Sequence, residues 1–275
     1  MITAQEVNKL RQMTGAGMMD CKKALVEADG DFDKAIELLR KTGQKVSASR
    51  AGRKTTEGVV VTYTNDDGSE AIIIGLGCET DFVAKNEEFE KLANDILSTA
   101  VSEKPSTIEE LKAASFSDVT LGEHIIEMVG KIGEKLDITA YEVLKGEKVI
   151  PYIHAGSKLG VLVALEGANG TEVSDAGKDV AMQIAAMNPI AVSGDSVSQD
   201  VISKEMEIGR EQARLEGKPE NILDKIAEGK VNKFLRENTL LNMSFVKNNK
   251  QTISQYLTEV HNGLTVSDFK RVSIG

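Results

Sequence analysis

A short apolar run, Ala71-Ile72-Ile73-Ile74-Gly75-Leu76, places the strongest constraint on how this chain folds. The run is too short for a typical helix and is rich in β-branched residues, so it predicts a buried strand. A second β-branched segment, Val59 to Tyr63, precedes it across Asn65-Asp66-Asp67-Gly68, which is a sequence typical of hairpin turns. The sequence therefore predicts a β-hairpin, opening at Gly58, whose second strand is buried.

A related pattern occurs later in the chain. Val149 to His154 and Val161 to Leu165 flank a glycine-containing turn, and a helix is predicted from Ala176 to about Met187. The first hairpin is likewise followed by an amphipathic helix, Asn86 to Leu97. Hairpin, loop and helix thus occur twice, which indicates an α+β core of two related subdomains, 58–142 and 143–275. Further predicted elements are helices at 107–114, 122–135 and 252–260 and a closing strand at 266–274.

The first residues predict a separate helical unit. Thr3-Ala4-Gln5-Glu6 is a capping box that starts a first helix, and Asp31 caps a third helix that runs to Thr42-Gly43. Three short helices within residues 1–43 resemble a ubiquitin-associated-type bundle. The following segment, 44–57, is basic, rich in small residues and without periodicity, so it predicts a linker on which the bundle moves.

The stretch 198–233 predicts a helical hairpin inserted in the second subdomain. Gly217-Lys218-Pro219 turns the chain, and a return helix continues through Lys230 to Phe234. Two antiparallel helices with narrow apolar seams are expected to protrude from the core. The first seam consists of Ile202, Met206, Gly209 and Ala213.

Composition excludes several classes of function. The 275 residues include 33 Lys and Arg and 43 Asp and Glu, which gives a net charge of −10. A general nucleic-acid binder needs a basic face, so this charge argues against that class of function. No apolar run approaches the ~20 residues that span a bilayer, and the first residues lack the features of a signal peptide. Cys21 and Cys78 are two lone cysteines, which is typical of a cytosolic protein whose thiols are reduced. We therefore expect a cytoplasmic protein that binds neither membranes nor nucleic acid directly.

The chain lacks the patterns that carry covalent chemistry. Its three histidines, His124, His154 and His261, have no metal-site spacing with one another or with the cysteines. No phosphate-binding Gly-rich loop is present, and no His or basic cluster adjoins Cys78 to activate its thiol. We therefore expect no catalytic residue, no metal and no cofactor. His154, at a predicted strand end, is expected to be either a hydrogen-bonded structural residue or a partner contact.

The segment Cys78 to Asn86 joins the apolar strand to its helix and carries an aromatic residue beside a carboxylate on a surface connection. Two interpretations are open. In the first, which residue type alone favours, Thr80 or Asp81 bonds the local backbone while Phe82 packs into the core. In the second, Phe82 is exposed and contacts a partner.

Met18 and Met19 present a similar choice. Met18 recurs with Cys21 and Leu25 at helical spacing, but consecutive helical residues cannot both point into one core, so one of the two methionines is expected to be exposed. Peripheral packing is one explanation of the exposed side chain. Contact of a flexible thioether with a groove of a partner is the other.

Two long motifs decide between these interpretations. Thr14 to Leu25 (TGAGMMDCKKAL) and Thr80 to Asn86 (TDFVAKN) resemble, in order and spacing, the signature segments of the bacterial elongation factor Ts family, the nucleotide exchange factors of elongation factor Tu. The chain departs from the family pattern at Thr139-Ala140, where an Arg pair is frequent, and at Gly275, beyond which many relatives extend into a further helix. The resemblance extends over almost the whole chain, because three further segments also resemble the family: Lys131 to Glu134, His154 to Gly156 and Lys230 to Phe234.

The resemblance implies that the chain binds elongation factor Tu carrying GDP and promotes GDP release, so that GTP is loaded during polypeptide elongation. It places Thr80, Asp81, Phe82 and Val83 against the nucleotide domain of the partner, where insertion of Phe82 disturbs the Mg²⁺ and phosphate site. Met18 and Met19 would form a second contact and His154 a third, and any higher assembly would use the second subdomain. The alternatives are a non-exchanging adaptor that binds through the three-helix bundle and, more remotely, an enzyme using Cys78 and His154.

Overall fold

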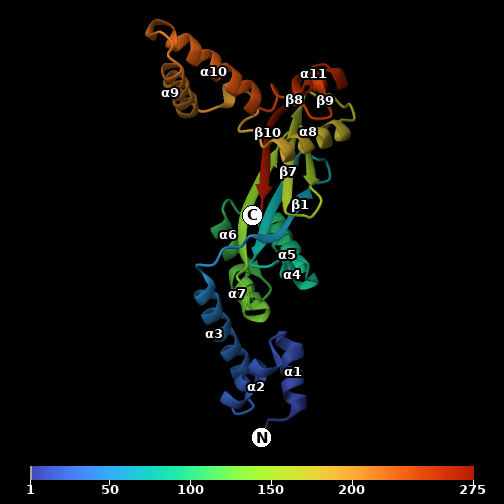
Figure 1. Cartoon of the computed structure of the whole chain (residues 1–275). Helices are drawn as coiled ribbons and strands as arrows, with labels where there is room; N and C mark the ends of the chain where they lie inside the picture. The colour runs from blue at the N-terminus through green and yellow to red at the C-terminus, as the bar shows by residue number, and fades with distance from the viewer. Residues whose placement is uncertain (1) are drawn as a thin grey trace.

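The computed structural model describes residues 2–275. Helices and antiparallel strands alternate along the chain, which confirms the predicted mixed α+β class. Figure 1 shows an elongated molecule with the N-terminal helices at one end, sheets in the middle and a pair of helices projecting at the other end. Within the described residues, no helix is long and apolar enough to cross a membrane.

Three helices form the N-terminal end: α1 (Ala4–Thr14), α2 (Met18–Glu27) and α3 (Phe32–Arg50). The predicted capping box is present, since the Thr3 hydroxyl accepts from the Glu6 N–H while the Glu6 carboxylate accepts from the Thr3 N–H at 2.7 Å. Asp31 caps α3, also as predicted. The helices enclose a small core made of Val7, Leu10, Cys21, Ala24, Leu25, Ala28 and Ala35.

The third helix is longer than predicted. It continues through Gly43 to Arg50, so residues 44–50 of the predicted linker are helical. Gly43 is buried where α3 crosses α7 (Leu121–Ile132), and a Cβ on Gly130 of α7 would lie 2.8 Å from the Cα of Gly43. Glycine therefore permits close helix packing here instead of ending the helix. Through this crossing, and an ion pair of Arg40 with Glu127 at 2.8 Å, α3 docks the N-terminal helices on the core.

The first sheet contains the predicted hairpin. Strand β1 (Glu57–Thr64) pairs antiparallel with β2 (Glu70–Cys78), and the turn between them closes with the Gly68 N–H donating to the Asn65 carbonyl. A third strand, β5 (Asp137–Lys145), pairs antiparallel with the other edge of β2. The strand order β1-β2-β5 therefore puts the apolar strand in the centre.

The second sheet has the same arrangement of strands. Strand β6 (Lys148–Ile153) forms a hairpin with β7 (Leu159–Glu166), and the closing strand β10 (Thr265–Ser273) pairs with the other edge of β7. The order β10-β7-β6 again puts the second hairpin strand in the centre.

The two sheets pack against each other, which explains the apolar run in β2. Alternate side chains of a strand point to opposite faces. Ile72, Ile74 and Leu76 therefore lie in a core beneath the helices of the first sheet, whereas Ala71 and Ile73 lie in a core between the sheets. The inter-sheet core also contains Val60, Leu144, Val149, Leu162, Ala164, Val272 and Ile274.

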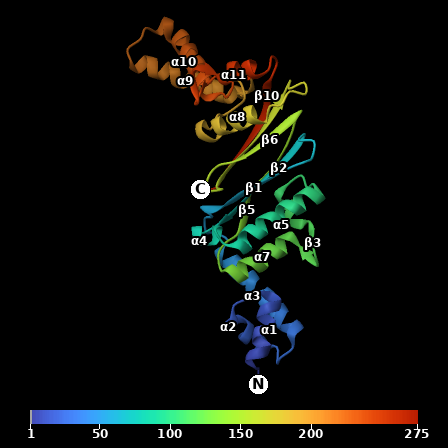
Figure 2. The same ribbon diagram turned by 90° about the vertical axis from the view of Figure 1, so that its right-hand side faces the viewer.

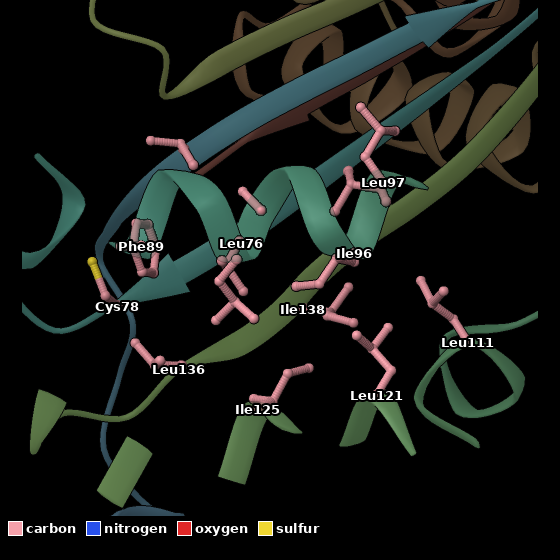
Figure 3. Close-up of a cluster of buried hydrophobic side chains, with 14 of the residues drawn as sticks. Leu76, Cys78, Phe89, Ile96, Leu97, Leu111, Leu121, Ile125, Leu136 and Ile138 are labelled. Carbon is pink, nitrogen blue, oxygen red and sulfur yellow. The ribbon is translucent and has the colours of Figure 1, made fainter. Parts of the chain in front are cut away.

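Helices cover the outer face of the first sheet. After β2 come a single turn, α4 (Asp81–Ala84), and the long α5 (Glu87–Glu103), which Asn86 caps as predicted. Figure 3 shows Phe89 and Ile96 of α5 on the side of the helix that faces Leu76 and Ile138 of the sheet. The rest of this layer consists of α6 (Ile108–Ala113), the short strands β3 (Ser115–Phe116) and β4 (Val119–Thr120), and α7.

The second sheet carries helices of its own and the projecting pair. Helix α8 (Ser174–Met187) packs on β6 and β7, and α9 (Gln199–Leu215) and α10 (Leu223–Asn238) lie side by side and away from the sheets in both views (Figures 1 and 2). Small residues permit their contact: a Cβ on Gly209 would lie 3.1 Å from the Cα of Ala227. The remaining elements are β8 (Ser244–Phe245), β9 (Asn248–Thr252), α11 (Ile253–Val260) and two short 3₁₀ helices, Gly194–Ser196 and Glu220–Ile222.

Candidate functional site

The turn after β2 presents a large apolar side chain to solvent. Phe82 of α4 is 84% exposed, whereas Phe89, at the start of α5, is fully buried. The interpretation of Phe82 as a core residue is therefore wrong. Ala84 is the buried residue of α4, and Val83 packs at the edge of the core of the first sheet. Burial of a Phe normally contributes stability, so the exposure of Phe82 on an ordered turn leaves an aromatic side chain available for contact with a partner.

Thr80 caps this turn, and Glu134 holds Thr80. The Thr80 hydroxyl accepts from the Val83 N–H at 3.5 Å and donates to Glu134 Oε1 at 2.7 Å. Glu134 Oε2 accepts from the backbone N–H groups of Glu79 and Thr80, at 3.1 and 3.0 Å. The carboxylate of Glu134 thus binds the start of the turn through three donors.

Asp81 faces solvent beside Phe82. Its carboxylate forms an ion pair with Lys85, one helical turn later, at 2.8 Å. The hydrogen bond and the positive charge of Lys85 lower the pKa of Asp81, so this carboxyl is ionised at neutral pH. The turn therefore offers an aromatic side chain and a negative charge next to each other.

Glu79, the residue before the cap, connects the turn to α3. Its carboxylate accepts from the Lys135 N–H at 2.7 Å and pairs with Arg50 and Arg53 at 2.7 and 2.8 Å. Burial acts to raise the pKa of Glu79, but the Lys135 N–H and the two guanidinium groups outweigh it and lower the pKa to about 2. The end of the longest N-terminal helix is thereby fixed to the residue that precedes the exposed turn.

This depressed pKa predicts a pH dependence of stability. Since the folded-state pKa of Glu79 lies below the ordinary glutamate value of 4.5, Glu79 contributes stability above about pH 4.5 and loses it as the pH falls towards about 2. We expect Glu79→Gln to lower the melting temperature at about pH 7 and to lower it much less at about pH 3. A melting-temperature difference that is constant between these pH values would contradict the ion-pair geometry.

Both methionines of the first motif are exposed. Met18 is 46% and Met19 62% exposed at the start of α2, so exposure is confirmed for more than the one methionine expected, and Met18 does not share the core position that its helical spacing with Cys21 and Leu25 suggested. Cys21 and Leu25 of the same helix fill the core instead. Met13 of α1 is 56% exposed as well, and sequence reasoning did not single it out.

His154 lies on the turn between β6 and β7 and is exposed. Its ring Nδ1 is 2.9 Å from the Tyr152 hydroxyl, and its backbone N–H donates to the Leu159 carbonyl. The ring is therefore both hydrogen-bonded and accessible. The structure thus gathers Thr80 to Val83 in one turn, whereas the methionines and His154 lie on other elements.

The cysteines are unsuited to nucleophilic chemistry. Burial, with the negative charges of Glu134 and Glu57, raises the pKa of Cys78 to about 12, and its Sγ donates to the Thr80 carbonyl at 3.2 Å. Cys21 is likewise free and buried. Within residues 2–275, no group of three His, Cys, Asp or Glu residues is placed to hold a metal ion.

We expect both thiols to react slowly with a thiol reagent in the native protein at neutral pH and rapidly after unfolding, because neither is accessible. Absorbance of the released reagent anion measures the two rates. Rapid labelling of native Cys78, or recovery of a Cys21–Cys78 disulfide, would contradict this arrangement.

Sequence reasoning missed the residues that hold the turn. Glu134 lies far along the chain from Thr80, and Arg50 and Arg53 fall in the segment predicted to be a linker. The one available signal was the segment Lys131 to Glu134, which carries part of the family resemblance. It indicated a shared feature but no role for the carboxylate.

Comparison with known proteins identifies the family. The family model described as "Elongation factor TS" matches residues 79–275. The chain is 59% identical to elongation factor Ts of Amoebophilus asiaticus over 274 residues, covering 100% of this chain and 99% of that protein. It is 55% identical to the protein of the same name from Cytophaga hutchinsonii (99% of each chain) and 50% identical to that of Christiangramia forsetii (100% and 99%). This chain belongs to the elongation factor Ts family.

Proposed function

We propose that this chain binds elongation factor Tu in its GDP-bound state and promotes GDP release, so that GTP is loaded during polypeptide elongation. Membership of the elongation factor Ts family implies nucleotide exchange on elongation factor Tu in translation. The observation that carries the proposal to a site is the exposure of Phe82 on a turn that is ordered by hydrogen bonds.

The proposed mechanism uses Phe82 as a wedge. Phe82 inserts between side chains of the nucleotide domain of the partner, and Asp81, Thr80 and Val83 accompany it. The intrusion would disturb the site where the partner holds Mg²⁺ beside the phosphates of GDP. Loss of that ion removes charge stabilisation from the bound pyrophosphate, and each ~1.4 kcal/mol lost weakens nucleotide binding tenfold.

Two further contacts are proposed on the same partner. Met18 and Met19, both exposed at the start of α2, would adapt to a groove of the nucleotide domain. His154 and the β6–β7 turn would reach a region farther from the nucleotide. The fixed attachment of α3 to α7 and to Glu79 supports the use of the methionines and Phe82 together, since it holds both on one framework.

The arrangement of the chain supports the proposed division into parts. We propose a ubiquitin-associated-like bundle at the N-terminus, two related subdomains, 58–142 and 143–275, and a helical hairpin at 198–233 inserted in the second subdomain. Any higher assembly would form through this second subdomain. The equivalent strand orders of the two sheets support the subdomain relationship. We also propose that the protein acts in the cytoplasm without a cofactor, without covalent chemistry of its own and without binding nucleic acid directly.

Release of a fluorescent GDP from elongation factor Tu tests the proposal. Stopped-flow mixing with this chain and excess unlabelled GDP is expected to accelerate the loss of fluorescence in proportion to the concentration of the chain. Binding without any acceleration would identify a non-exchanging adaptor instead. Absence of binding would remove elongation factor Tu as the partner.

A further inference from the structure

The exposed turn cannot hold its own shape. Helix α4 is a single turn, and an isolated turn of helix is unstable because its nucleation fixes several residues for very few hydrogen bonds. Ala84 and part of Val83 anchor the end of the turn in the core, but Asp81 and Phe82 at its start are exposed and lack such packing. Contacts from outside the turn must therefore set the direction in which Phe82 points.

Those contacts form a reciprocal pair of carboxylates. Glu134 accepts from the backbone N–H groups of Glu79 and Thr80 and from the Thr80 hydroxyl. In return, Glu79 accepts from the backbone N–H of Lys135, the residue after Glu134. Each of the two loops thus binds the backbone of the other through a charged acceptor. Charge-assisted bonds of this kind are roughly twice as strong as neutral ones.

The Thr80 hydroxyl relays this contact into the turn. It donates to Glu134 and accepts from the Val83 N–H, so the position of the carboxylate determines the position of the cap and of the first helical N–H groups. The relay runs from Glu134 through Thr80 to Val83, which adjoins Phe82. Bonds connected in this way polarise and reinforce one another.

We propose that Glu134 is a positioning residue for Phe82: its carboxylate holds the Thr80 cap so that the wedge is already oriented before elongation factor Tu binds. The inference rests on the proposed function and adds to it a residue outside the signature turn. If the turn is already ordered, binding of the partner does not carry the entropic cost of ordering Phe82. A mobile turn would lose that conformational entropy each time it binds.

The chain offers a matched control on α7, the helix that ends just before Glu134. Glu123, in the first turn of α7, accepts from the N–H and the hydroxyl of Thr120 at 2.8 and 3.1 Å, a pattern close to that of Glu134 with Thr80. Glu123→Ala therefore removes a carboxylate and a similar set of bonds without touching the exposed turn. Hydrogen exchange of the peptide spanning 79–84 and release of fluorescent GDP are measured for Glu134→Ala and Glu123→Ala.

We expect Glu134→Ala to speed hydrogen exchange in this peptide and to slow stimulated GDP release about tenfold, while Glu123→Ala changes neither. We also expect no further loss when Glu134→Ala is added to Phe82→Ala, measured at concentrations where the residual acceleration is still detectable. This dependence on Phe82 separates positioning from a general loss of stability.

Equal GDP release by Glu134→Ala and Glu123→Ala would overturn the proposal, as would an undiminished effect of Glu134→Ala in the Phe82→Ala background. If Glu134→Ala does not fold, Thr80→Val removes only the hydroxyl of the relay, and unchanged release by folded Thr80→Val overturns the proposal.

If the unmodified chain fails to accelerate GDP release, the proposed function fails, and hydrogen exchange alone decides. Faster exchange at 79–84 in Glu134→Ala then supports the positioning role, and unchanged exchange overturns it.

Discussion

Phe82→Ala is expected to leave the fold intact and to lower stimulated GDP release by at least tenfold. The side chain is 84% exposed, so its truncation removes little buried surface, and exposed substitutions typically change stability by no more than about 0.5 kcal/mol. An aromatic side chain at the centre of an interface commonly contributes about 2 kcal/mol or more to binding, which corresponds to roughly a thirtyfold change. Thermal melting and stopped-flow release of fluorescent GDP measure the two effects.

Leu215→Ala is the matched control for this prediction. Leu215 is also 84% exposed and apolar, but it lies at the end of α9 on the projecting pair of helices. We expect Leu215→Ala to change neither the melting temperature nor GDP release. Unchanged release by folded Phe82→Ala, or equal losses for the two variants, would contradict the wedge mechanism.

Phe89→Ala is expected to have the opposite pattern. Phe89 is fully buried in the core beneath α5, close to Cys78 and Leu76 (Figure 3). Truncation of a buried Phe costs about 3–5 kcal/mol, because transfer energy is lost and a cavity remains. For a chain of this size we expect the melting temperature to fall on the order of ten degrees.

The exchange activity of Phe89→Ala separates its structural role from contact with the partner. Below its melting transition, the variant is expected to release GDP at a rate close to that of the unmodified chain, once the rate is scaled to the folded fraction. A melting temperature that does not change would contradict the burial of Phe89. Since both phenylalanines lie close together in the sequence, the pair tests whether the chain buries one and presents the other.

Local patterns predicted the elements that have local causes. Thr3 and Asp31 cap helices where their spacing indicated, because an N-cap bonds a backbone group only two or three residues away. The apolar run of β2 was correctly predicted to be a buried strand, and its turn at Gly68 formed the expected hairpin. Phe82 shows the limit of residue type, because hydrophobicity favoured the core and only the family resemblance indicated exposure.

Features that depend on distant residues could not be predicted in this way. Gly43 suggested a helix end, but Gly130 of α7 provides the close contact that makes a buried glycine favourable within α3. Strand β5 was missed because it is an edge strand in which only Ile138 and Leu144 are buried, and it has no continuous apolar run. The bonds of Glu134 with Thr80 join loops far apart in sequence, and no local spacing contains that information.

The affinity of this chain for elongation factor Tu, measured with and without GDP, tests the central claim most directly. Exchange requires that the chain and GDP weaken each other's binding by the same factor, because thermodynamic linkage is reciprocal. We predict that the chain binds nucleotide-free elongation factor Tu more tightly than the GDP-bound form, and that the ratio of its two dissociation constants equals the ratio measured for GDP with and without the chain. Equal affinity of the chain for the two forms would contradict nucleotide exchange and leave only an adaptor.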